Sequence, residues 1–475
     1  ADGITSTALI VLALRSLHAT VIPYIPDRIE EGYGLNTKAI DQIYEQGAKL
    51  LITVDNGIRS ITEIDYANSL GLTVIVTDHH TPGDLLPAAA ALINPKLPDD
   101  PYPNKNLAGV GVVYKLVQRL CDFFPELNPD QYLDLVAIGT IADMVPLSGE
   151  NRYLVRQGLT QINHSPRQGL SSLIGVANML NRKIITSDIS YQIGPRINSS
   201  GRLDTESAYT PLNLLISSDP AESGLLAQIV ENHNAKRKAF TRKLEEKIDV
   251  YLLKFDPLPS AIIILEDDIY LGVAGIAAGN LCRKYNSPAV VGQIGKDFTT
   301  ASCRSIPAFN IIEALDSCQN LFTHYGGHAL AAGFTIANKN LSKLREHLKS
   351  LADEKLDGLD LRPFLKIDAT VNFQDLHEKL HRELQKLEPT GEKNQVPVLV
   401  ARNLKATQVK RIGKENNHLK FNVSDGKYSF EAIGFGLGEY AEIMPERFDL
   451  AFNLTINEYR GVRDFQLRIL DFKLS

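Results

Sequence analysis

Asp78, His79 and His80 are the residues whose types and spacing most directly suggest chemistry. They follow the β-branched run 74–77, which predicts a buried parallel strand. Ligands of open α/β sheets bind beyond the carboxyl ends of the strands. Pro82-Gly83 then turns the chain, so both imidazoles can face one pocket. Oxygen and imidazole ligands suit Mn, Zn or Fe better than Ca. A surface loop with two histidines is the alternative, and the preceding buried strand argues against it.

Asp55 is a second carboxylate that directly follows a predicted strand. Residues 49–54 are expected to form a strand that ends at Asp55, and residues 60–70 a helix that leads into the strand before Asp78. This βαβ alternation predicts a parallel sheet, and right-handed crossovers place both strand ends at one edge. Asp143 follows an apolar helix expected over 132–141, where a carboxylate needs a partner or a metal. A role as a turn residue stays open for Asp143.

Three other segments suit phosphate. Residues 191–203 combine Arg196, Asn198 and Arg202 with glycines, a composition typical of phosphate contact by a loop and the following helix. In a second α/β unit, residues 302–305 follow a probable strand and include a serine and an arginine. Residues 325–329 contain Gly-Gly-His and are expected to open an Ala-rich helix, whose backbone amides could approach an anion.

The remaining pattern supplies the elements that position these residues. We expect helices over 5–18 and 37–47, a strand over 20–25, and a long charged helix from 221 to about 255 that connects two domains. From about residue 364, short alternating strands separated by Gly and Asn turns predict a small antiparallel barrel. Lys410 and Arg411 belong to its basic first half, near several aromatic residues: Phe421, Tyr428, Phe430 and Phe435. This mixture suits single-stranded nucleic acid, although a solvated face over core aromatics fits it too.

Composition bounds the class of protein. The 475 residues require two to four domains, and 44% hydrophobic with 22% charged residues is ordinary for a globular chain. The net charge of −6 gives no global nucleic-acid signal, but a basic groove can coexist with an acidic metal site. We predict no membrane span. The four cysteines lack CxxC spacing, which indicates a reducing cytoplasm. Because the chain opens with Ala1-Asp2-Gly3 and no strand feeds its first helix, we expect that an N-terminal segment precedes it.

Taken together, these segments resemble the DHH phosphoesterase superfamily, and within it the RecJ family of single-strand-specific 5′→3′ exonucleases. The resemblance covers nearly the whole chain. It is carried by the order and spacing of short motifs, which are Asp2-Gly3 with Thr5 and Ser6, Asp55-Asn56-Gly57, Asp78-His79-His80, Gly139-Thr140-Ile141-Ala142-Asp143, Pro195-Arg196-Ile197-Asn198 with Gly201-Arg202, Ser302-Cys303-Arg304-Ser305, Gly326-Gly327-His328, and Leu387-Glu388-Pro389-Thr390-Gly391. In the family the first motif reads D-x-D-G, and its first aspartate would lie just before Ala1.

The resemblance implies a metal site with two Mn²⁺ or Mg²⁺ ions. The implied metal residues are Asp2, Asp55, Asp78, His79, His80 and Asp143, and the implied catalytic residues are His79, His80, Asp143, Arg196 and His328. The 5′-phosphate and the DNA would be bound by Arg28, Asn198, Arg202, Ser302, Arg304, Gly326, Gly327, Lys410 and Arg411. It further implies action in DNA repair and recombination, with single-stranded DNA as substrate and a single-strand-binding protein and a helicase as partners. We expect a monomer.

The expected architecture is a parallel-sheet DHH domain over 1–215, a connecting helix over 216–256, a second α/β domain, the DHH-associated domain, over 257–355, and an OB-fold barrel over 360–475. Two other functions remain open. One is a DHH phosphodiesterase of short oligonucleotides or cyclic dinucleotides, whose relatives resemble only the two α/β domains. The other is a non-catalytic DNA-binding relative, which would have lost the metal ligands.

Overall fold

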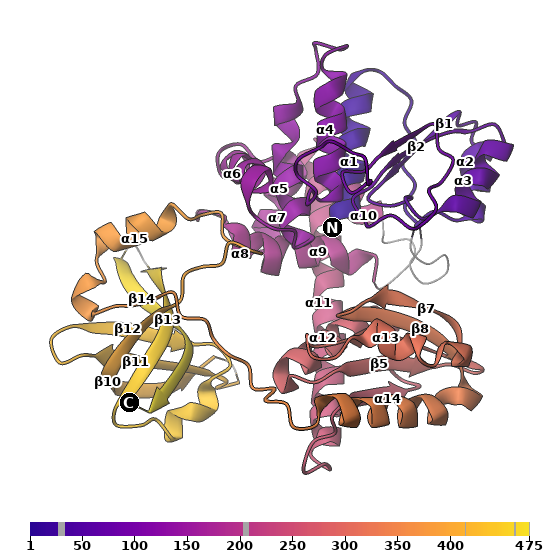
Figure 1. Cartoon of the computed structure of the whole chain (residues 1–475). Coiled ribbons are helices and arrows are strands. Elements are labelled where there is room, and N and C mark those ends of the chain that lie inside the picture. The colour runs from indigo at the N-terminus through magenta and orange to yellow at the C-terminus, as the bar shows by residue number, and fades with distance from the viewer. Residues whose placement is uncertain (27–33, 203–208, 414, 460–461, 475) are drawn as a thin grey trace. The chain divides into compact units, whose positions relative to one another are not determined.

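The fold is described from a computed structural model, which covers residues 1–26, 34–202, 209–413, 415–459 and 462–474 (Figure 1). The chain forms two compact units. The first comprises residues 1–143 and 158–363, and the second comprises residues 144–157 and 364–475. None of the helices in these ranges is long and apolar enough to cross a membrane.

The first part of the chain is a small parallel sheet accompanied by helices. Its strands lie in the order β1-β2-β3, and all pairings are parallel. Val74 and Val76 of β2 are fully buried against Ile40 and Ile64 of the flanking helices, which explains why this short β-branched run forms a strand. The elements are α1 (Asp2–Ser16), α2 (Thr37–Glu45), β1 (Leu50–Val54), α3 (Ile61–Ser69), β2 (Thr73–Thr77), β3 (Ala91–Ile93), α4 (Gly109–Leu120), η1 (Pro129–Tyr132) and α5 (Leu133–Ala142).

A run of helices follows and ends in the long helix α11. These elements are α6 (Gly149–His164), α7 (Gln168–Val176), α8 (Thr186–Asp188), η2 (Ile189–Ile193), α9 (Gly194–Ser200), α10 (Tyr209–Ile216) and α11 (Pro220–Leu252). The Asp219 carboxylate caps α11 by accepting hydrogen bonds from the amides of Ala221 and Glu222. The predicted connecting helix is therefore present, with 33 residues.

The second α/β part has a mixed five-stranded sheet in the order β4-β5-β6-β8-β7, in which only β4 and β5 are parallel. Its core includes Val290, Cys303, Phe334 and Ile336, packed against α12 and α14. The elements are β4 (Ile262–Glu266), α12 (Leu271–Tyr285), β5 (Ala289–Ile294), β6 (Phe298–Arg304), α13 (Ile311–Asp316), η4 (Gln319–Leu321), β7 (Phe322–His328), β8 (Ala331–Ala337), η5 (Asn338–Asn340) and α14 (Leu341–Leu356).

The second unit contains a closed five-stranded barrel. Its strand order β11-β12-β14-β13-β10 is closed by pairing of β10 with β11, and β12 runs parallel to β14. This is the topology of an OB-fold, so the predicted barrel is confirmed. The elements are β9 (Ala369–Thr370), η6 (Phe373–Asp375), α15 (Glu378–Gln385), β10 (Leu399–Ile412), β11 (His418–Ser424), β12 (Ser429–Gly434), η7 (Gly438–Glu442), β13 (Phe448–Tyr459) and β14 (Val462–Leu474).

Several local predictions were wrong. Residues 302–304 were expected to follow a strand but are the end of β6, and residues 191–200 were expected to include a loop but are helical in η2 and α9. Residues 20–25 form no strand, although the segment is apolar; the three-stranded sheet gives it no partner. Gly326-Gly327-His328 ends strand β7, and the following alanines belong to β8, so no helix begins there. Burial of Ala332, Phe334 and Ile336 alternates along β8, and this period of two marks a strand. Gly327 is needed because a Cβ there would lie 2.4 Å from the Ala332 Cα.

Candidate metal centre

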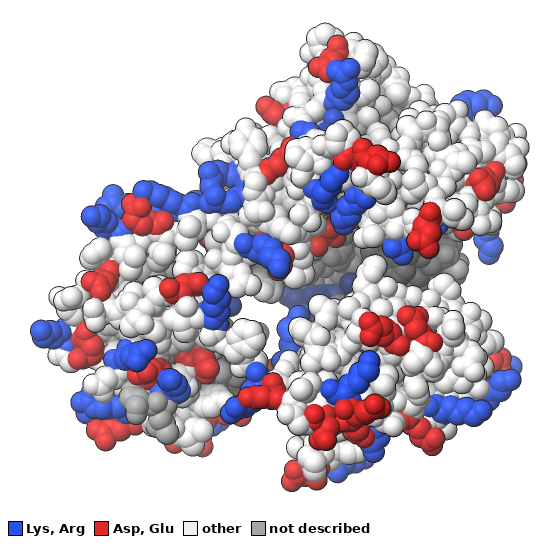
Figure 2. Space-filling view, viewed as in Figure 1, with Lys and Arg blue, Asp and Glu red and all other residues white. Residues whose placement is uncertain are grey.

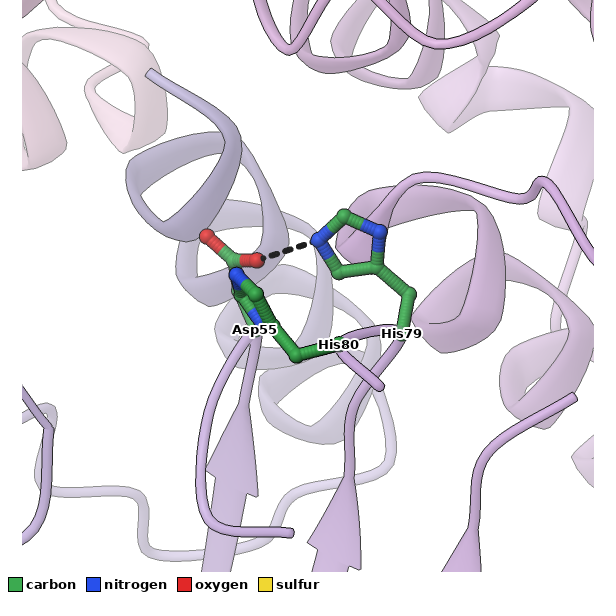
Figure 3. Close-up of side chains that lie close together, drawn as sticks. All are labelled: Asp55, His79 and His80. Atoms are coloured by element: carbon green, nitrogen blue, oxygen red, sulfur yellow. Dashed lines mark ion pairs between the residues drawn. The ribbon is translucent and has the colours of Figure 1, made fainter. Parts of the chain in front are cut away.

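Two neighbouring strands deliver a carboxylate and two imidazoles to one place (Figure 3). The register pairs Val54 of β1 with Thr77 of β2, so Asp55 and the Asp78-His79-His80 segment leave the sheet at the same level. The Asp55 amide still donates to the Thr77 carbonyl over 3.0 Å. Asp55 then turns with a φ of +61°, a left-handed conformation that aspartate tolerates better than most residues. Its carboxylate and the His79 ring consequently face each other (Figure 3).

Two helix ends add further carboxylates. Asp2 begins α1, and its two oxygens accept hydrogen bonds of 2.7 and 2.9 Å from the amides of Gly109 and Val110, at the start of α4. Asp143 follows the last residue of α5. Helices α1, α4 and α5 pack against one another next to the sheet, which brings these residues to the strand ends (Figure 1).

His79 is the centre of the cluster. Its Nε2 lies 3.0 Å from Asp55 Oδ1, 3.7 Å from Asp143 Oδ2 and 3.8 Å from Asp2 Oδ2. Two sets of residues have ligand atoms within 4.8 Å of one another, Asp55 with His79 and His80, and Asp2 with His79 and Asp143. Among the described residues, Asp55 Oδ1 and both ring nitrogens of His79 are buried without a hydrogen-bond partner. Buried polar atoms are costly in that state, so this donor set fits divalent cations.

The pKa values of Asp2, His79 and Asp143 are shifted by burial and by the charges of neighbouring residues in the cluster. Burial, together with the charges of Asp55 and Asp143, raises the pKa of Asp2 to about 7. Burial acts to lower the pKa of His79, but the contact of its Nε2 with the Asp55 carboxylate and the charges of Asp2 and Asp143 outweigh burial and raise this pKa to about 9. Burial also raises the pKa of Asp143. Carboxylates crowded around one imidazolium are the arrangement that a cation of higher charge would stabilise.

Asp78 lies at the carboxyl end of β2, as predicted, but among the described residues it belongs to neither ligand set. Its carboxylate is engaged in hydrogen bonds. Its Oδ1 accepts from the His79 amide at 2.7 Å and the His80 amide at 3.1 Å and contacts His80 Nδ1 at 2.7 Å, while its Oδ2 accepts from the Ile58 amide at 3.0 Å. Contact with Nδ1 leaves Nε2 of His80 free for a metal. The structure therefore favours an orienting role for Asp78 over direct ligation, since such carboxylates fix the tautomer and direction of a metal-binding histidine.

Glycines of α4 and α5 allow the carboxylates to converge. A Cβ at Gly109 would lie 2.7 Å from the Asp55 Cβ and 2.8 Å from its Oδ1. A Cβ at Gly139 would lie 2.8 Å from Asp2 Oδ1. Neither glycine was predicted from the sequence to be part of the site. The Gly-Val-Gly segment that opens α4 was a usable signal, because glycine at such a place often permits close backbone approach.

Of the residues that the resemblance implies for catalysis and DNA binding, Arg196 and Asn198 lie on α9 and Arg202 follows this helix. Arg196 is 5% exposed; its Nε donates to Glu231 over 2.5 Å and its Nη1 to the carbonyl and side chain of Gln192. Asn198 contacts Ala1, the neighbour of Asp2. Arg202 donates to the Gly272 carbonyl at the start of α12. Of these three residues, Asn198 is thus the one in contact with the start of α1.

Ser302 and Arg304, which the resemblance implies for binding the 5′-phosphate, lie on the five-stranded sheet. The cross-strand register sets Ser302 level with Gly333 and Gly326, and Arg304 level with Ala331 and His328. Ser302 and Arg304 point toward α12, where a Cβ on Gly275 would lie 3.3 Å from Arg304 Nη2 and 3.4 Å from Ser302 Oγ. These side chains and the first turns of α12 therefore share one small space. Arg28, predicted to join them, lies outside the described residues.

On the barrel, the predicted basic residues are exposed. Of the predicted aromatic residues, some belong to the core and others are exposed. Lys410 is paired in register with Lys420, and Arg411 forms an ion pair of 2.8 Å with Glu442. Phe421 is core and Phe430 packs against it, whereas Tyr428 and Phe435 are 47% and 56% exposed. Figure 2 shows lysine and arginine interspersed with aspartate and glutamate on the visible face of the described chain, so binding of a polyanion depends on local groups rather than on overall charge.

Comparison with known proteins assigns a class to this architecture. The family model of the DHH family N-terminal domain matches residues 1–140, that of the DHHA1 domain residues 259–354, and that of the RecJ OB domain residues 367–471. The first of these matches covers most of the metal centre. The fold and the site thus define a DHH protein with an associated second domain and an OB barrel.

Comparison with individual proteins identifies the family within this class. RecJ of Escherichia coli, a single-stranded-DNA-specific exonuclease, is 35% identical over 99% of this chain and 85% of its own length. The Bacillus subtilis RecJ is 36% identical over the whole chain, which spans 60% of that relative. The crystal structure of Thermus thermophilus RecJ in complex with Mn²⁺ superposes with a TM-score of 0.86 at 29% identity, over 100% of this chain and 67% of the other. The chain belongs to the RecJ family.

Proposed function

We propose that the chain hydrolyses single-stranded DNA from its 5′ end as a metal-dependent exonuclease in DNA repair and recombination. The observation that carries the proposal is the convergence of Asp2, Asp55, Asp143, His79 and His80 on one centre. Membership of a family whose relatives are named single-stranded-DNA-specific exonucleases supports the substrate. The barrel supports a nucleic-acid strand over a small nucleotide, because an OB-fold offers a face for several successive bases.

The proposed cofactors are two Mn²⁺ or Mg²⁺ ions, supported by the two overlapping ligand sets and by the Mn²⁺ and Mg²⁺ named in the structures of Thermus thermophilus RecJ. Bound divalent cations supply Lewis acidity toward phosphate oxygens and lower the pKa of water. The chain would hold them through Asp55, His79 and His80 on one side and Asp2, His79 and Asp143 on the other. Asp78 would keep His80 in the tautomer that presents Nε2.

The remaining site residues would position the strand. Arg196 and His328 would contact the scissile region, and Asn198 and Arg202 would bind the DNA strand. Ser302 and Arg304, with the amides of the first turn of α12, form a group of donors suited to a terminal phosphate. In the described part of the chain the N-cap residue of that helix, Tyr270, makes no side-chain capping hydrogen bond, so amides at the helix start could face a ligand. Selection for a 5′-phosphate by this group, with Arg28, Gly326 and Gly327, would give the enzyme its polarity.

The barrel would bind the strand on the outer face of β11, β12 and β14. His418 and Lys420 point outward there, because Leu419 between them and Phe421 after them are buried. Phe435 is exposed between two partners, His418 with ring centroids 5.3 Å apart and Arg468 with its guanidinium carbon 5.7 Å from the ring. An exposed aromatic ring beside a cation suits stacking of an unpaired base. Lys410, across from Lys420, would contact the phosphate backbone, and Arg411 would add charge at the rim.

A digestion assay tests the proposal. The full chain with Mn²⁺ should release mononucleotides from 5′-phosphorylated single-stranded DNA, and a strand labelled at its 3′ end should shorten progressively. Blunt duplex DNA should resist, and His79→Ala should abolish release. A series of substrate lengths, with a cyclic dinucleotide included, separates this function from that of a small-substrate phosphodiesterase. Activity confined to dinucleotides, or full activity in His79→Ala, would contradict the proposal.

Several finer features complete the proposal. We propose a DHH domain over 1–215, a connecting helix over 216–256, a DHH-associated domain over 257–355 and an OB domain over 360–475. We also propose a cytoplasmic, monomeric protein that works with a single-strand-binding protein and a helicase. The described cysteines are unpaired, as the reducing compartment requires. Sedimentation and pull-down with each partner are the corresponding tests.

A further inference from the structure

Helix α11 carries a polar residue in the middle of its buried stripe. Ala227, Val230, Leu244 and Ile248 follow one another along this stripe, and Asn234 occupies a position within it with 0% exposure. A buried amide without a full set of hydrogen bonds costs more than an apolar side chain of similar size. The position therefore calls for an explanation beyond packing.

Asn234 holds a neighbouring arginine in place. Its Oδ1 accepts a hydrogen bond of 2.9 Å from Arg237 Nη2, one helical turn further on. Because a guanidinium only donates, this bond fixes which side of the amide faces Arg237. The Asn234 Nδ2 and the Arg237 Nε are both buried and lack an acceptor in the part of the chain that the structure describes.

Two other cationic side chains, Arg196 and Lys238, lie near enough to Arg237 to interact with it electrostatically. Burial and the nearby charge of Arg196 both lower its pKa, and burial with the charges of Arg196 and Arg237 lowers the pKa of Lys238. The acidic neighbour, Glu231, is engaged by Arg196 over 2.5 Å. Within the described ranges, Arg237 itself has no ion pair. We call Arg196, Arg237 and Lys238 the α11 cation cluster; with Glu231 it has three positive charges and one negative charge.

Without a bound anion, the like charges of such a cluster do not stabilise the folded chain. Like charges at close range repel, and a half-buried guanidinium without a carboxylate has lost hydration without a compensating partner. An anionic ligand would offset both the repulsion between the cations and the loss of hydration of the guanidinium. The cluster offers donors only, and a guanidinium fork matches phosphate oxygens, which identifies the ligand as a phosphate group.

The cluster is linked to the metal centre through α9, which packs on α11 (Figure 1). Arg196 enters the cluster, and Asn198, two residues further along α9, contacts Ala1 beside Asp2. We propose that Arg237 binds an internal backbone phosphate of the DNA strand, with Arg196 and Lys238 beside it and with Asn234 as the residue that positions its guanidinium. The proposal rests on the proposed function only in taking single-stranded DNA as the ligand.

The test measures binding without hydrolysis, so that it does not depend on exonuclease activity. Affinity of the full chain for 5′-phosphorylated oligodeoxythymidylate is measured in EDTA at a series of salt concentrations. Arg237→Gln keeps the length of the side chain and removes its charge, and Arg237→Lys keeps the charge without the fork. Arg242→Gln is the matched control, because Arg242 is exposed on the same helix and pairs with Glu246 over 2.7 Å.

We expect Arg237→Gln to weaken binding about tenfold at low salt. The plot of log affinity against log salt should also become less steep by about 0.7, the change expected when one contact to a single-stranded phosphate is lost. Arg237→Lys should restore the slope, Asn234→Leu should weaken binding while the slope stays near the wild-type value, and Arg242→Gln should leave both unchanged. A merely structural role of Arg237 would change stability without this change in slope.

An unchanged slope in Arg237→Gln, with or without a loss of affinity, would overturn the proposal. If deoxythymidine 5′-monophosphate also competes less well for binding to this variant than to the wild-type chain, the cluster binds the released product instead. If the wild-type chain digests no DNA in the separate exonuclease assay but the slope changes as expected, the proposed function fails and the phosphate site stands.

Discussion

Replacing Gly109 by alanine should displace Asp55 from the metal centre while leaving helix α4 in place. The new Cβ would lie 2.7 Å from the Asp55 Cβ and 2.8 Å from its Oδ1, whereas ordinary van der Waals contact begins at 3.4 Å. Asp55 would have to move by about 0.7 Å, the difference between 3.4 and 2.7 Å. The Gly109 amide, which donates to Asp2, is kept in alanine, so the effect should fall on Asp55.

The expected change in the stability of Gly109→Ala is the sum of two opposing contributions. Overpacking costs about 1–3 kcal/mol, and replacing a helical glycine by alanine returns about 1 kcal/mol. Stability of the metal-free protein should therefore change little, by about 0–2 kcal/mol. A misplaced ligand should cost about 10- to 100-fold in Mn²⁺ affinity and about 100-fold in the rate of DNA hydrolysis.

The assay is Mn²⁺ titration by calorimetry, together with thermal unfolding and single-turnover digestion of single-stranded DNA. Gly111→Ala is the matched control in the same helix, because its Cβ would meet the flexible Leu107 side chain at 3.2 Å and no metal residue. Wild-type Mn²⁺ affinity in Gly109→Ala would refute the reasoning, as would an equal loss in Gly111→Ala.

Three further predictions concern other parts of the chain. Asp78→Asn should lower Mn²⁺ affinity about 10- to 100-fold because His80 loses its orienting partner, yet saturating Mn²⁺ should restore hydrolysis; a loss that no Mn²⁺ concentration reverses would mean direct ligation. Because the pKa of His79 is raised to about 9 and that of Asp2 to about 7, the metal-free imidazole is protonated and the Asp2 carboxyl partly protonated at neutral pH, so Mn²⁺ binding should release about one to two protons and strengthen as pH rises toward 9. Binding heats that are the same in buffers of different ionisation enthalpy would contradict this. Phe435→Ala should weaken binding of single-stranded DNA by about 1–3 kcal/mol, whereas Phe298→Ala, which removes an equally exposed ring on β6, should not; equal effects in a fluorescence binding assay would exclude a stacking role.

The part of the site built from strand ends could be predicted from the sequence. A β-branched run followed by Asp-His-His, and a second run followed by Asp55, carry their own local signal, and βαβ alternation sets both at one sheet edge. Asp2 and Asp143 lie at helix ends, where a carboxylate has many structural roles. Their place depended on resemblance to the DHH superfamily, and packing of α1, α4 and α5 explains how they arrive.

Other features could not be predicted because they depend on tertiary contacts. Whether Asp78 binds a metal or the surrounding amides depends on the direction that the backbone takes after the strand. Gly-Gly-His was expected to open a helix, but pairing with β8 makes it a strand, since cross-strand partners outweigh the local composition. Arg237 lies in a charged helix and is distinguished only by a buried Asn234 and by Arg196 from another helix.

Anomalous diffraction from crystals of the full chain soaked in Mn²⁺ would locate the bound metal ions. Peaks are expected between the carboxylates of Asp2, Asp55 and Asp143 and the rings of His79 and His80, and they should be lost in His79→Ala crystals. Manganese bound elsewhere, or a His79→Ala protein that keeps the same peaks, would contradict this expectation.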